Sequence, residues 1–291
     1  MVYSGINSVN FSDLCDRSGN LIEVIGDDSF CQQLAFFCQE LSGFNSAVVV
    51  SFLNKEKPLI LYDNLPEQYR EKSLQPYVEG AYLLDPLYEI YKKGSEDGIY
   101  RLRDLASREF EDSEYYNHYF EQTGIVDEVC ALVKISSDIS IEISFGYRKP
   151  ETPGLPQPDM QRLIDCFPLI QAACRQNWQR GNQLAPLKRQ LRTGGEFGVT
   201  LDAAFANFGK SILSPRECEI VQLILKGYSS EAIAEMLEIS RETVKVHRKR
   251  CHSKLKINTS AELFSLFLEA ISLVPLGVSD EDPLSYFYED N

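Results

Sequence analysis

The hydrophobic positions in the first half of the chain alternate between helical and strand spacing. Residues 28–42 repeat apolar side chains three or four positions apart, and this spacing predicts an amphipathic helix. Residues 46–53 and 58–62 are short apolar runs around a polar turn, which predicts a β-hairpin. Apolar and polar residues alternate strictly at 139–147, within a second hairpin predicted over 125–147.

Helices are expected on either side of these hairpins. Residues 66–93 are predicted to be helical in pieces, 113–122 to form a short helix, and 159–178 to form a long amphipathic one. The resulting order is helix, hairpin, helices, hairpin, helix. It predicts an α+β fold in which one antiparallel sheet carries helices on both faces, an α/β/α sandwich.

Four shorter helices are predicted in 213–272, and each begins at a recognisable cap. Ser214 and Glu217 form a capping box, with Pro215 at the first helical position. The other helices begin at hydroxyl side chains that can accept a hydrogen bond from a backbone N–H. These caps are Ser229 or Ser230, Ser240, and Thr259 or Ser260. The pattern predicts an all-α unit that contains a helix-turn-helix.

The chain is acidic overall but basic in one short segment. Its 291 residues carry a formal net charge of −14, which taken alone argues against a nucleic-acid partner. The tail 274–291 has no basic residue and five acidic ones. Residues 241–256, in contrast, hold seven lysines and arginines against one glutamate. Either a solvated helix face or a surface that meets a phosphate backbone would have this composition.

Several classes of protein are not expected from this sequence. No stretch approaches the roughly 20 apolar residues of a membrane span, and the first 25 residues lack the pattern of a secretory signal, so we expect a cytoplasmic protein. The eight cysteines form no C-x-x-C pair and the three histidines have no zinc-site spacing, so we expect free thiols, no metal and no cofactor. No glycine-rich phosphate loop or G-x-S-x-G motif indicates an enzyme, and no catalytic residue is expected.

The basic segment separates into two faces if it is a helix. The inward face, with spacings of three or four, consists of Val244, His247, Cys251 and Leu255. The neighbouring face consists of Lys245, Val246, Lys249 and Ser253. A helix fits the major groove of DNA, where lysine can donate to guanine and an apolar side chain can touch the thymine methyl group. This second face is therefore a candidate for reading bases.

Residues 213–272 resemble the LuxR-type DNA-binding domain, also called the NarL/FixJ or GerE type. The residues that carry the resemblance are Leu213 to Glu217, Gly227, Ile233, Ala234, Leu237, Ile239, Ser240, Thr243 to His247, Lys254 and Leu255. Members of this family place the third helix in the major groove and dimerise through the fourth. In the fourth helix, the residues that would divide between core and dimer contact are Leu263, Leu266, Phe267 and Ala270.

The resemblance also assigns DNA contacts. It implies that Lys245, Val246 and Lys249 face the bases and that Thr243 meets a phosphate. Flanking and neighbouring residues complete the expected DNA-binding set: Arg248 and Arg250 on the DNA backbone, Ser230 at the start of the second helix, and Ser253. The family often has Asn-Lys where this chain has Ser230-Glu231, a departure that removes one phosphate contact.

The first half of the chain is similar to regulatory domains that accompany such DNA-binding units. Residues 81–86 resemble the tyrosine and Asp-Pro signature of quorum-sensing autoinducer-binding domains, in which the aspartate accepts a hydrogen bond from the ligand amide. Glu114 to Tyr116 and Gly124 to Glu128 resemble the GAF/PAS-like sandwiches of orphan LuxR-type regulators. The lactone-contacting tryptophan of true receptors is missing, because the only tryptophan is Trp178. The resemblance therefore implies an orphan regulator rather than an acyl-homoserine lactone receptor. A phosphorylated receiver is not expected, since residues 66–74 are predicted to be helical where that fold needs a strand.

A ligand pocket in such a sandwich would lie between one sheet face and the helices of 66–93. The candidate lining residues are Tyr69, Tyr77, Tyr82, Asp85, Tyr88, Ser140 and Ser144. Tyrosines supply rings with a polar end, and the aspartate supplies an acceptor. Partial burial at the surface would explain the tyrosines equally well, and Asp85 before Pro86 could mark a helix break.

These features together predict a transcriptional regulator organised in four segments: a sensing and dimerisation domain (1–179), a linker (180–209), the DNA-binding domain (210–273) and an acidic tail (274–291) expected to be disordered. We expect a homodimer that binds a pseudo-palindromic operator in double-stranded DNA and responds to a small-molecule effector. RNA polymerase is a further expected partner. The alternative is a constitutive or thiol-redox-controlled regulator whose first domain is only a scaffold for dimerisation or protein interaction.

Overall fold

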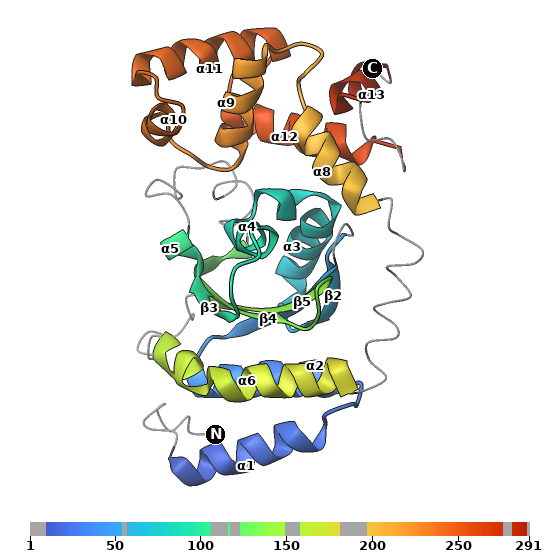
Figure 1. Ribbon diagram of the computed structural model, residues 1–291, viewed down its shortest axis with the longest axis vertical. Coiled ribbons are helices and arrows are strands. Elements are labelled where there is room, and N and C mark those ends of the chain that lie inside the picture. Colours follow the sequence, from blue (N-terminus) through green and yellow to red (C-terminus); the bar gives the residue numbers. More distant parts are fainter. Residues whose placement is uncertain are drawn as a thin grey trace.

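A five-stranded antiparallel sheet organises the first half of the chain (Figure 1). The computed structural model describes residues 10–53, 57–105, 116, 123–148, 158–180, 197–275 and 281–289. The sheet has the order β2-β1-β5-β4-β3. Its strands are β1 (Ser46–Leu53), β2 (Leu59–Asp63), β3 (Gly98–Arg101), β4 (Ile125–Lys134) and β5 (Ile139–Arg148). Both predicted hairpins, β1–β2 and β4–β5, are confirmed, whereas β3 was not predicted.

Helices cover both faces of this sheet, which confirms the predicted α+β class. One face carries α2 (Phe30–Ser42) and α6 (Met160–Arg180), with α1 (Phe11–Glu23) packed outside them (Figure 1). The other face carries α3 (Glu67–Glu79), the 3₁₀ turn η1 (Ala81–Leu84) and α4 (Pro86–Lys92), and α5 (Leu102–Leu105) follows β3. Of the predicted helix at 113–122, only Tyr116 lies within the described residues.

Apolar residues alternate with polar or small residues along β5, so the two faces of the sheet differ in polarity. Ile141, Ile143 and Phe145 join the apolar core formed with α2 and α6, where Phe30 and Trp178 meet edge to face at 5.4 Å. The intervening residues of β5 are polar or small and point toward α3, η1 and α4. A strand has a side-chain period of two, so a strict alternation at the sequence level becomes one apolar and one polar sheet face.

The second half of the chain is helical. Its helices are α8 (Phe197–Asn207), α9 (Pro215–Leu225), α10 (Ser230–Met236), α11 (Arg241–Leu255), α12 (Ser260–Ser272) and α13 (Pro283–Glu289). The capping box of α9 is complete, because the Ser214 side chain accepts the Glu217 N–H and the Glu217 side chain accepts the Ser214 N–H. The caps of the next three helices are Ser229, Ser240 and Thr259, each accepting a backbone N–H of the first turn.

Two of these helices lie in segments for which the sequence predicted none. Helix α8 falls inside the predicted linker, of which residues 181–196 lie outside the described part of the chain. The prediction of a disordered end is wrong for residues 283–289, which form α13. Asp282 holds this helix in place by accepting hydrogen bonds from the backbone N–H groups of Gly209 and Ser211, at 2.9 and 2.8 Å. Leu284 is buried, so the tail adds to the core of the helical half.

The two halves of the chain contact each other through α4 and the turn before η1. Glu89 of α4 pairs with Lys226 at the end of α9 (2.6 Å), and Lys92 pairs with Asp202 of α8 (2.9 Å). Gly80 faces α12 so closely that a Cβ there would lie 3.6 Å from Ile271 Cγ2. One apolar cluster accordingly extends from the α3–α4 side of the sheet into α9, α11 and α12.

We expect Glu217→Gln to lower the stability of the helical half most strongly at neutral pH. Burial disfavours the charged carboxylate, but hydrogen bonds from Lys254 and from the Ser214 N–H outweigh it and lower the pKa of Glu217 from 4.5 to about 2. Such a group stabilises the fold above its unfolded pKa, and this contribution is lost as the pH falls from about 5 toward 2.

Thermal unfolding of the wild type and the variant at pH 7 and pH 3 tests this. The glutamine can keep the hydrogen bond of the cap but has no charge. The difference in melting temperature between wild type and variant should therefore be smaller at pH 3, where the contribution of the Glu217 charge is partly lost. Glu219→Gln, on the exposed side of α9, is the control. An equal difference at both pH values would contradict the assignment.

Candidate nucleic-acid interface and sensor cavity

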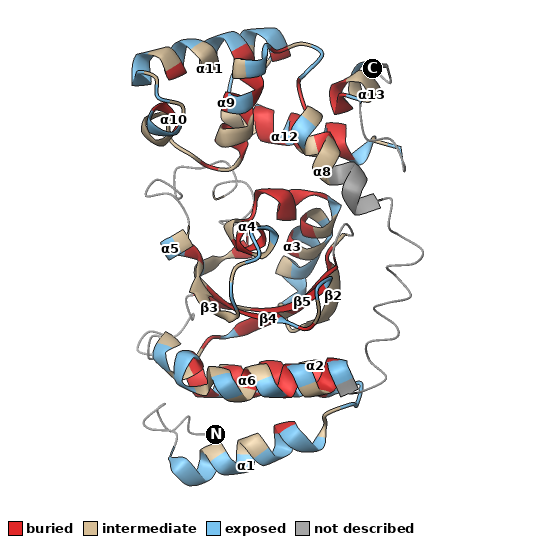
Figure 2. Cartoon of the chain, in the orientation of Figure 1, coloured by how far each residue is buried: buried red, intermediate tan, exposed pale blue. Residues whose placement is uncertain are grey.

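Helix α11 presents a basic face to solvent. Val244, Cys251 and Leu255 are buried against the other helices of this half. The outward residues are exposed along the far side of the helix: Lys245, Val246, Lys249, Arg250 and Ser253 (Figure 2). Val246 keeps 48% of its surface exposed, an apolar side chain among cations. This combination suits the major groove, in which guanine presents hydrogen-bond acceptors and thymine presents a methyl group.

Several of the predicted DNA contacts also take part in bonds within the domain, and among them Lys245 donates to Glu242 Oε1 at 2.9 Å. Thr243 donates its backbone N–H to Ser240 Oγ at 3.0 Å and shares a hydrogen bond with the same hydroxyl. Arg248 donates to Ser230 Oγ at 3.2 Å and to Ser260 Oγ at 2.9 Å, so this arginine ties α11 to the first residues of α10 and α12. Its guanidinium therefore positions the basic face as well as adding charge to it.

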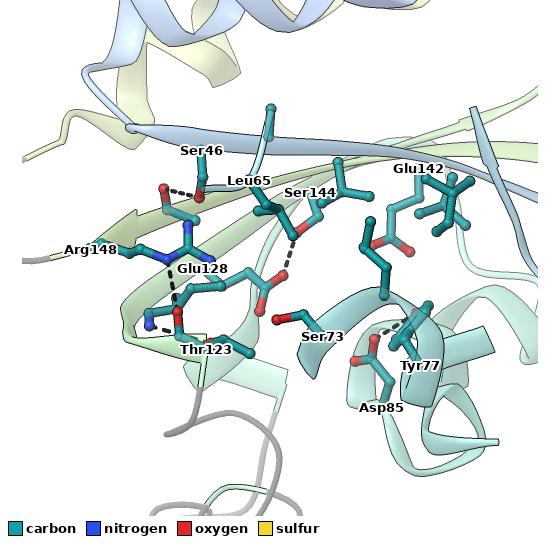
Figure 3. Close-up of a pocket in the computed structure, with 17 residues that line it drawn as sticks. Ser46, Leu65, Ser73, Tyr77, Asp85, Thr123, Glu128, Glu142, Ser144 and Arg148 are labelled. Carbon is teal, nitrogen blue, oxygen red and sulfur yellow. Dashed lines mark hydrogen bonds between the residues drawn. The ribbon is translucent and has the colours of Figure 1, made fainter. Parts of the chain in front are cut away.

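The polar face of the sheet, under α3 and η1, encloses a cavity of about 60 Å³ (Figure 3). Tyr77 donates its hydroxyl proton to Asp85 Oδ2 at 2.9 Å, while Asp85 Oδ1 caps α4 by accepting the Leu87 N–H at 2.8 Å. On the strands, Ser144 donates to Glu128. Tyr77, Asp85, Ser144 and Glu128 are thus held in fixed orientations by these hydrogen bonds.

Burial shifts the protonation of this cavity toward neutral carboxyl groups. Burial raises the pKa of Asp85 to about 6. The hydrogen bonds from the Leu87 N–H and from Tyr77 favour the charged form and lower this pKa, but their effect is smaller than that of burial. Burial and the charge of Asp85 raise the pKa of Glu128 to about 7. The pKa of Glu142 is well above its usual value for the same reasons, and burial lowers the pKa of Arg148. The three acids cannot all ionise together at low cost.

Comparison with known proteins identifies the helical half. Residues 211–267 match the family described as bacterial regulatory proteins, luxR family. A protein of Aeromonas salmonicida named as an HTH-type transcriptional regulator in the exeN 3′ region is 31% identical over 193 residues, which cover 66% of this chain and 97% of that protein. The chain belongs to the luxR family. It is therefore a DNA-binding transcriptional regulator.

Other similarities of this luxR-family regulator are partial or more distant. The oxygen regulatory protein NreC of Staphylococcus carnosus is 41% identical over 68 residues, 23% of this chain and 31% of that protein. The VqsR LBD domain of Pseudomonas aeruginosa has a TM-score of 0.49 at 23% identity, covering 58% of this chain and 97% of that one. Escherichia coli SdiA has a TM-score of 0.39 at 17% identity, covering 91% and 100%.

Only some of the residues predicted to bind a ligand in this luxR-family regulator lie together in the cavity. Tyr77, Asp85 and Ser144 line the cavity. Tyr82 is packed in the apolar core, and Tyr88 and Ser140 line a separate recess between α4 and the sheet. Tyr69 lies outside the lining, although its ring stacks on the guanidinium of Arg148 at 4.9 Å. The residues that do meet come from three elements: Tyr77 near the end of α3, Asp85 at the N-cap of α4 and Ser144 on β5.

Sequence reasoning missed the charged residues Glu128, Glu142 and Arg148 as members of the cavity. A signal for Glu142 was present: in the strict alternation of β5 it lies between Ser140 and Ser144 and shares their face. A carboxylate at a covered strand position is rare unless it has a partner or a role. Arg148, at the end of the same strand, follows the same parity.

The cysteines of the regulator give little support to control by thiol oxidation. All eight are described and free, and only Cys15 is exposed. Burial raises the pKa of Cys31 and of Cys251 to about 12, so neither is a reactive thiolate at neutral pH. In the described residues, no helix is long and apolar enough to cross a membrane and no group of three ligands could hold a metal ion.

We expect Glu128→Gln to make this regulator more stable at pH 8 but not at pH 5. A carboxyl with a raised pKa keeps its proton in the folded state, while the unfolded chain releases it above about pH 4.5. The free energy of unfolding therefore falls as the pH rises from about 4.5 to 7. The glutamine cannot ionise and can still accept the Ser144 hydrogen bond.

Thermal unfolding between pH 5 and pH 8 measures the difference, with Glu96→Gln on the exposed surface as the control. A variant that is less stable than the wild type at pH 8 would show that the carboxylate is charged and favourable in the fold.

Proposed function

We propose that this regulator is a homodimer whose binding to a pseudo-palindromic operator is controlled by a small molecule in the cavity under α3 and η1. The observation that carries the proposal is the double role of Asp85. Its carboxylate lines the cavity and also caps α4, and α4 carries Glu89 and Lys92, which pair with the DNA-binding half. A ligand that altered the environment of Asp85 would act on this connection.

On DNA, we propose that Lys245, Val246 and Lys249 read base edges while Thr243 and Arg250 meet phosphates. Ser253 extends the base-reading face by one turn. Arg248 and Ser230 would add a backbone contact at the junction of α10 and α11, where they already bond to each other.

A homodimer would supply the two recognition helices that a pseudo-palindrome requires. The four α12 residues expected to divide between core and dimer contact are all buried within this chain: Leu263, Leu266, Phe267 and Ala270. We therefore propose that dimerisation uses the outer helices of the sheet, where Ile22, Phe36 and Ile164 are exposed apolar side chains. RNA polymerase would be the partner through which the DNA-bound dimer acts on transcription.

Lys249 and Arg250 are neighbours with different proposed roles, one in reading bases and the other in contacting phosphate, so their substitutions should have different effects. Lys249→Ala should relax the sequence preference at one or two base pairs, at a cost of about 1–3 kcal/mol on the operator alone. Arg250→Ala should weaken binding to all sequences alike and reduce the slope of log affinity against log salt by about one.

Operator fragments selected from genomic DNA, with single-base variants of each, provide the measurement by fluorescence anisotropy at several salt concentrations. Equal losses on every sequence for Lys249→Ala would contradict its role in reading bases. Failure of the wild type to bind any fragment at low salt would contradict the proposed function.

The connection between the halves makes a second prediction. Glu89 and Lys226 are both about three-quarters buried, so Glu89→Gln and Lys226→Gln should each alter operator affinity and cost about 0.5–1 kcal/mol of stability. Because both changes remove one interaction, the double variant should be no worse than either single variant.

This double-mutant cycle is measured by thermal unfolding and by anisotropy titrations of the two single variants and the double variant. Arg70→Gln is the control, because the ion pair of Arg70 with Asp63 lies away from the junction. Strictly additive effects, or unchanged DNA affinity in all variants, would show that α4 does not couple the two halves.

A further inference from the structure

Arg148 brings a positive charge into the cavity with donors to spare. The residue is only 9% exposed and lies at the end of β5. Its Nε donates to the Thr123 carbonyl at 2.8 Å, and its guanidinium stacks on the ring of Tyr69. Nη1 and Nη2 are buried, and in the described structure neither has a hydrogen-bond partner. Unsatisfied buried donors on a charged group are costly, so this site is suited to an acceptor that comes from outside.

The opposite side of the cavity is acidic. Figure 3 shows Asp85 and Glu142 away from Arg148, with Glu128 between them. Glu142 is 2% exposed. Its electrostatic neighbours are the like charges of Asp85 and Glu128, not Arg148. A cation placed among these carboxyl groups would remove the repulsion that disfavours their ionised forms.

The two sides together define the chemistry of a ligand. A carboxylate matches a guanidinium with two parallel hydrogen bonds, and an ammonium group offers three donors to surrounding carboxyl groups. The lining also contains the apolar side chains of Val48, Val50 and Ile60. The small volume of the cavity, about 60 Å³, favours a compact ligand.

We propose that the cavity binds a small zwitterion of the amino-acid class, with its carboxylate on Arg148 and its ammonium group among Asp85, Glu128 and Glu142. This inference deepens the proposed function, because it names the chemical class of the molecule expected at the same site. It also gives Asp85 an ion-pair partner while that residue caps α4, so the ligand would act directly on the helix that joins the two halves.

Thermal unfolding of the full chain against a panel of probes tests the proposal. The panel contains the twenty α-amino acids together with β-alanine, 4-aminobutyrate and 5-aminopentanoate, which separate the two charges by increasing lengths of chain. We expect at least one probe to raise the melting temperature saturably. Its methyl ester, which lacks the carboxylate, and its deaminated acid, which lacks the ammonium group, should each bind at least tenfold more weakly by calorimetry.

Two variants assign the charges to residues. Arg148→Gln should abolish the preference for the zwitterion over its methyl ester, and Glu142→Gln should reduce the preference over the deaminated acid. Arg101→Gln, whose ion pair with Asp127 lies outside the cavity, should leave both preferences unchanged. If Arg148→Gln does not fold, the comparison of probe, ester and deaminated acid on the wild type decides the matter.

The proposal is overturned if no zwitterion stabilises the wild type, or if an ester or deaminated acid binds as tightly as the parent probe. Unchanged preferences in a folded Arg148→Gln protein would also overturn it. These titrations contain no DNA, so their failure alongside intact operator binding counts against this inference alone. Loss of operator binding alone counts against the proposed function.

Discussion

A polar sheet face that is nevertheless covered by helices is the constraint on which the rest of this structure depends. The apolar residues of β5 pack on α2 and α6, and the polar residues of the same strand face α3 and η1. Apolar side chains cannot seal such a face cheaply, because buried polar groups need partners. The result is a cavity in which Ser144 and Tyr77 donate to carboxylates, and in which burial raises the pKa of Glu128 to about 7.

The cavity and the DNA-binding half meet in one short helix. Asp85 begins α4, and Glu89 and Lys92 lie one and two turns further on, where they pair with Lys226 and Asp202. A helix of seven residues spans about 10 Å, so the cap at Asp85 lies close to both ion pairs. Control of DNA binding would additionally require that a ligand favour one arrangement of the two halves over another.

The basic helix is held in place by polar residues of its own domain. Glu217 caps α9 and accepts a hydrogen bond from Lys254 of α11, so one carboxylate joins the two helices. Arg248 ties α11 to the starts of α10 and α12 through Ser230 and Ser260. These bonds and the buried side of α11 fix the helix, and Lys249 and Arg250 face solvent from it.

The sequence by itself determined what depends on local spacing. The period of two in β5, the caps Ser214 and Ser240, and the outward face of α11 follow from residues a few positions apart, and the structure agrees with each. The luxR-type motif was readable for the same reason, since it lies within one continuous segment.

Only the tertiary structure decided which distant residues meet. Asp282 reaches Gly209, Arg148 stacks on Tyr69, and the apolar side of α12 is buried by its own chain, none of which has a local signature. It also separated Tyr77, Asp85 and Ser144, which share a cavity, from Tyr82, Tyr88 and Ser140, which do not. Spacing along a chain fixes the face on which a side chain lies, whereas the packing of one element on another fixes what that face encloses.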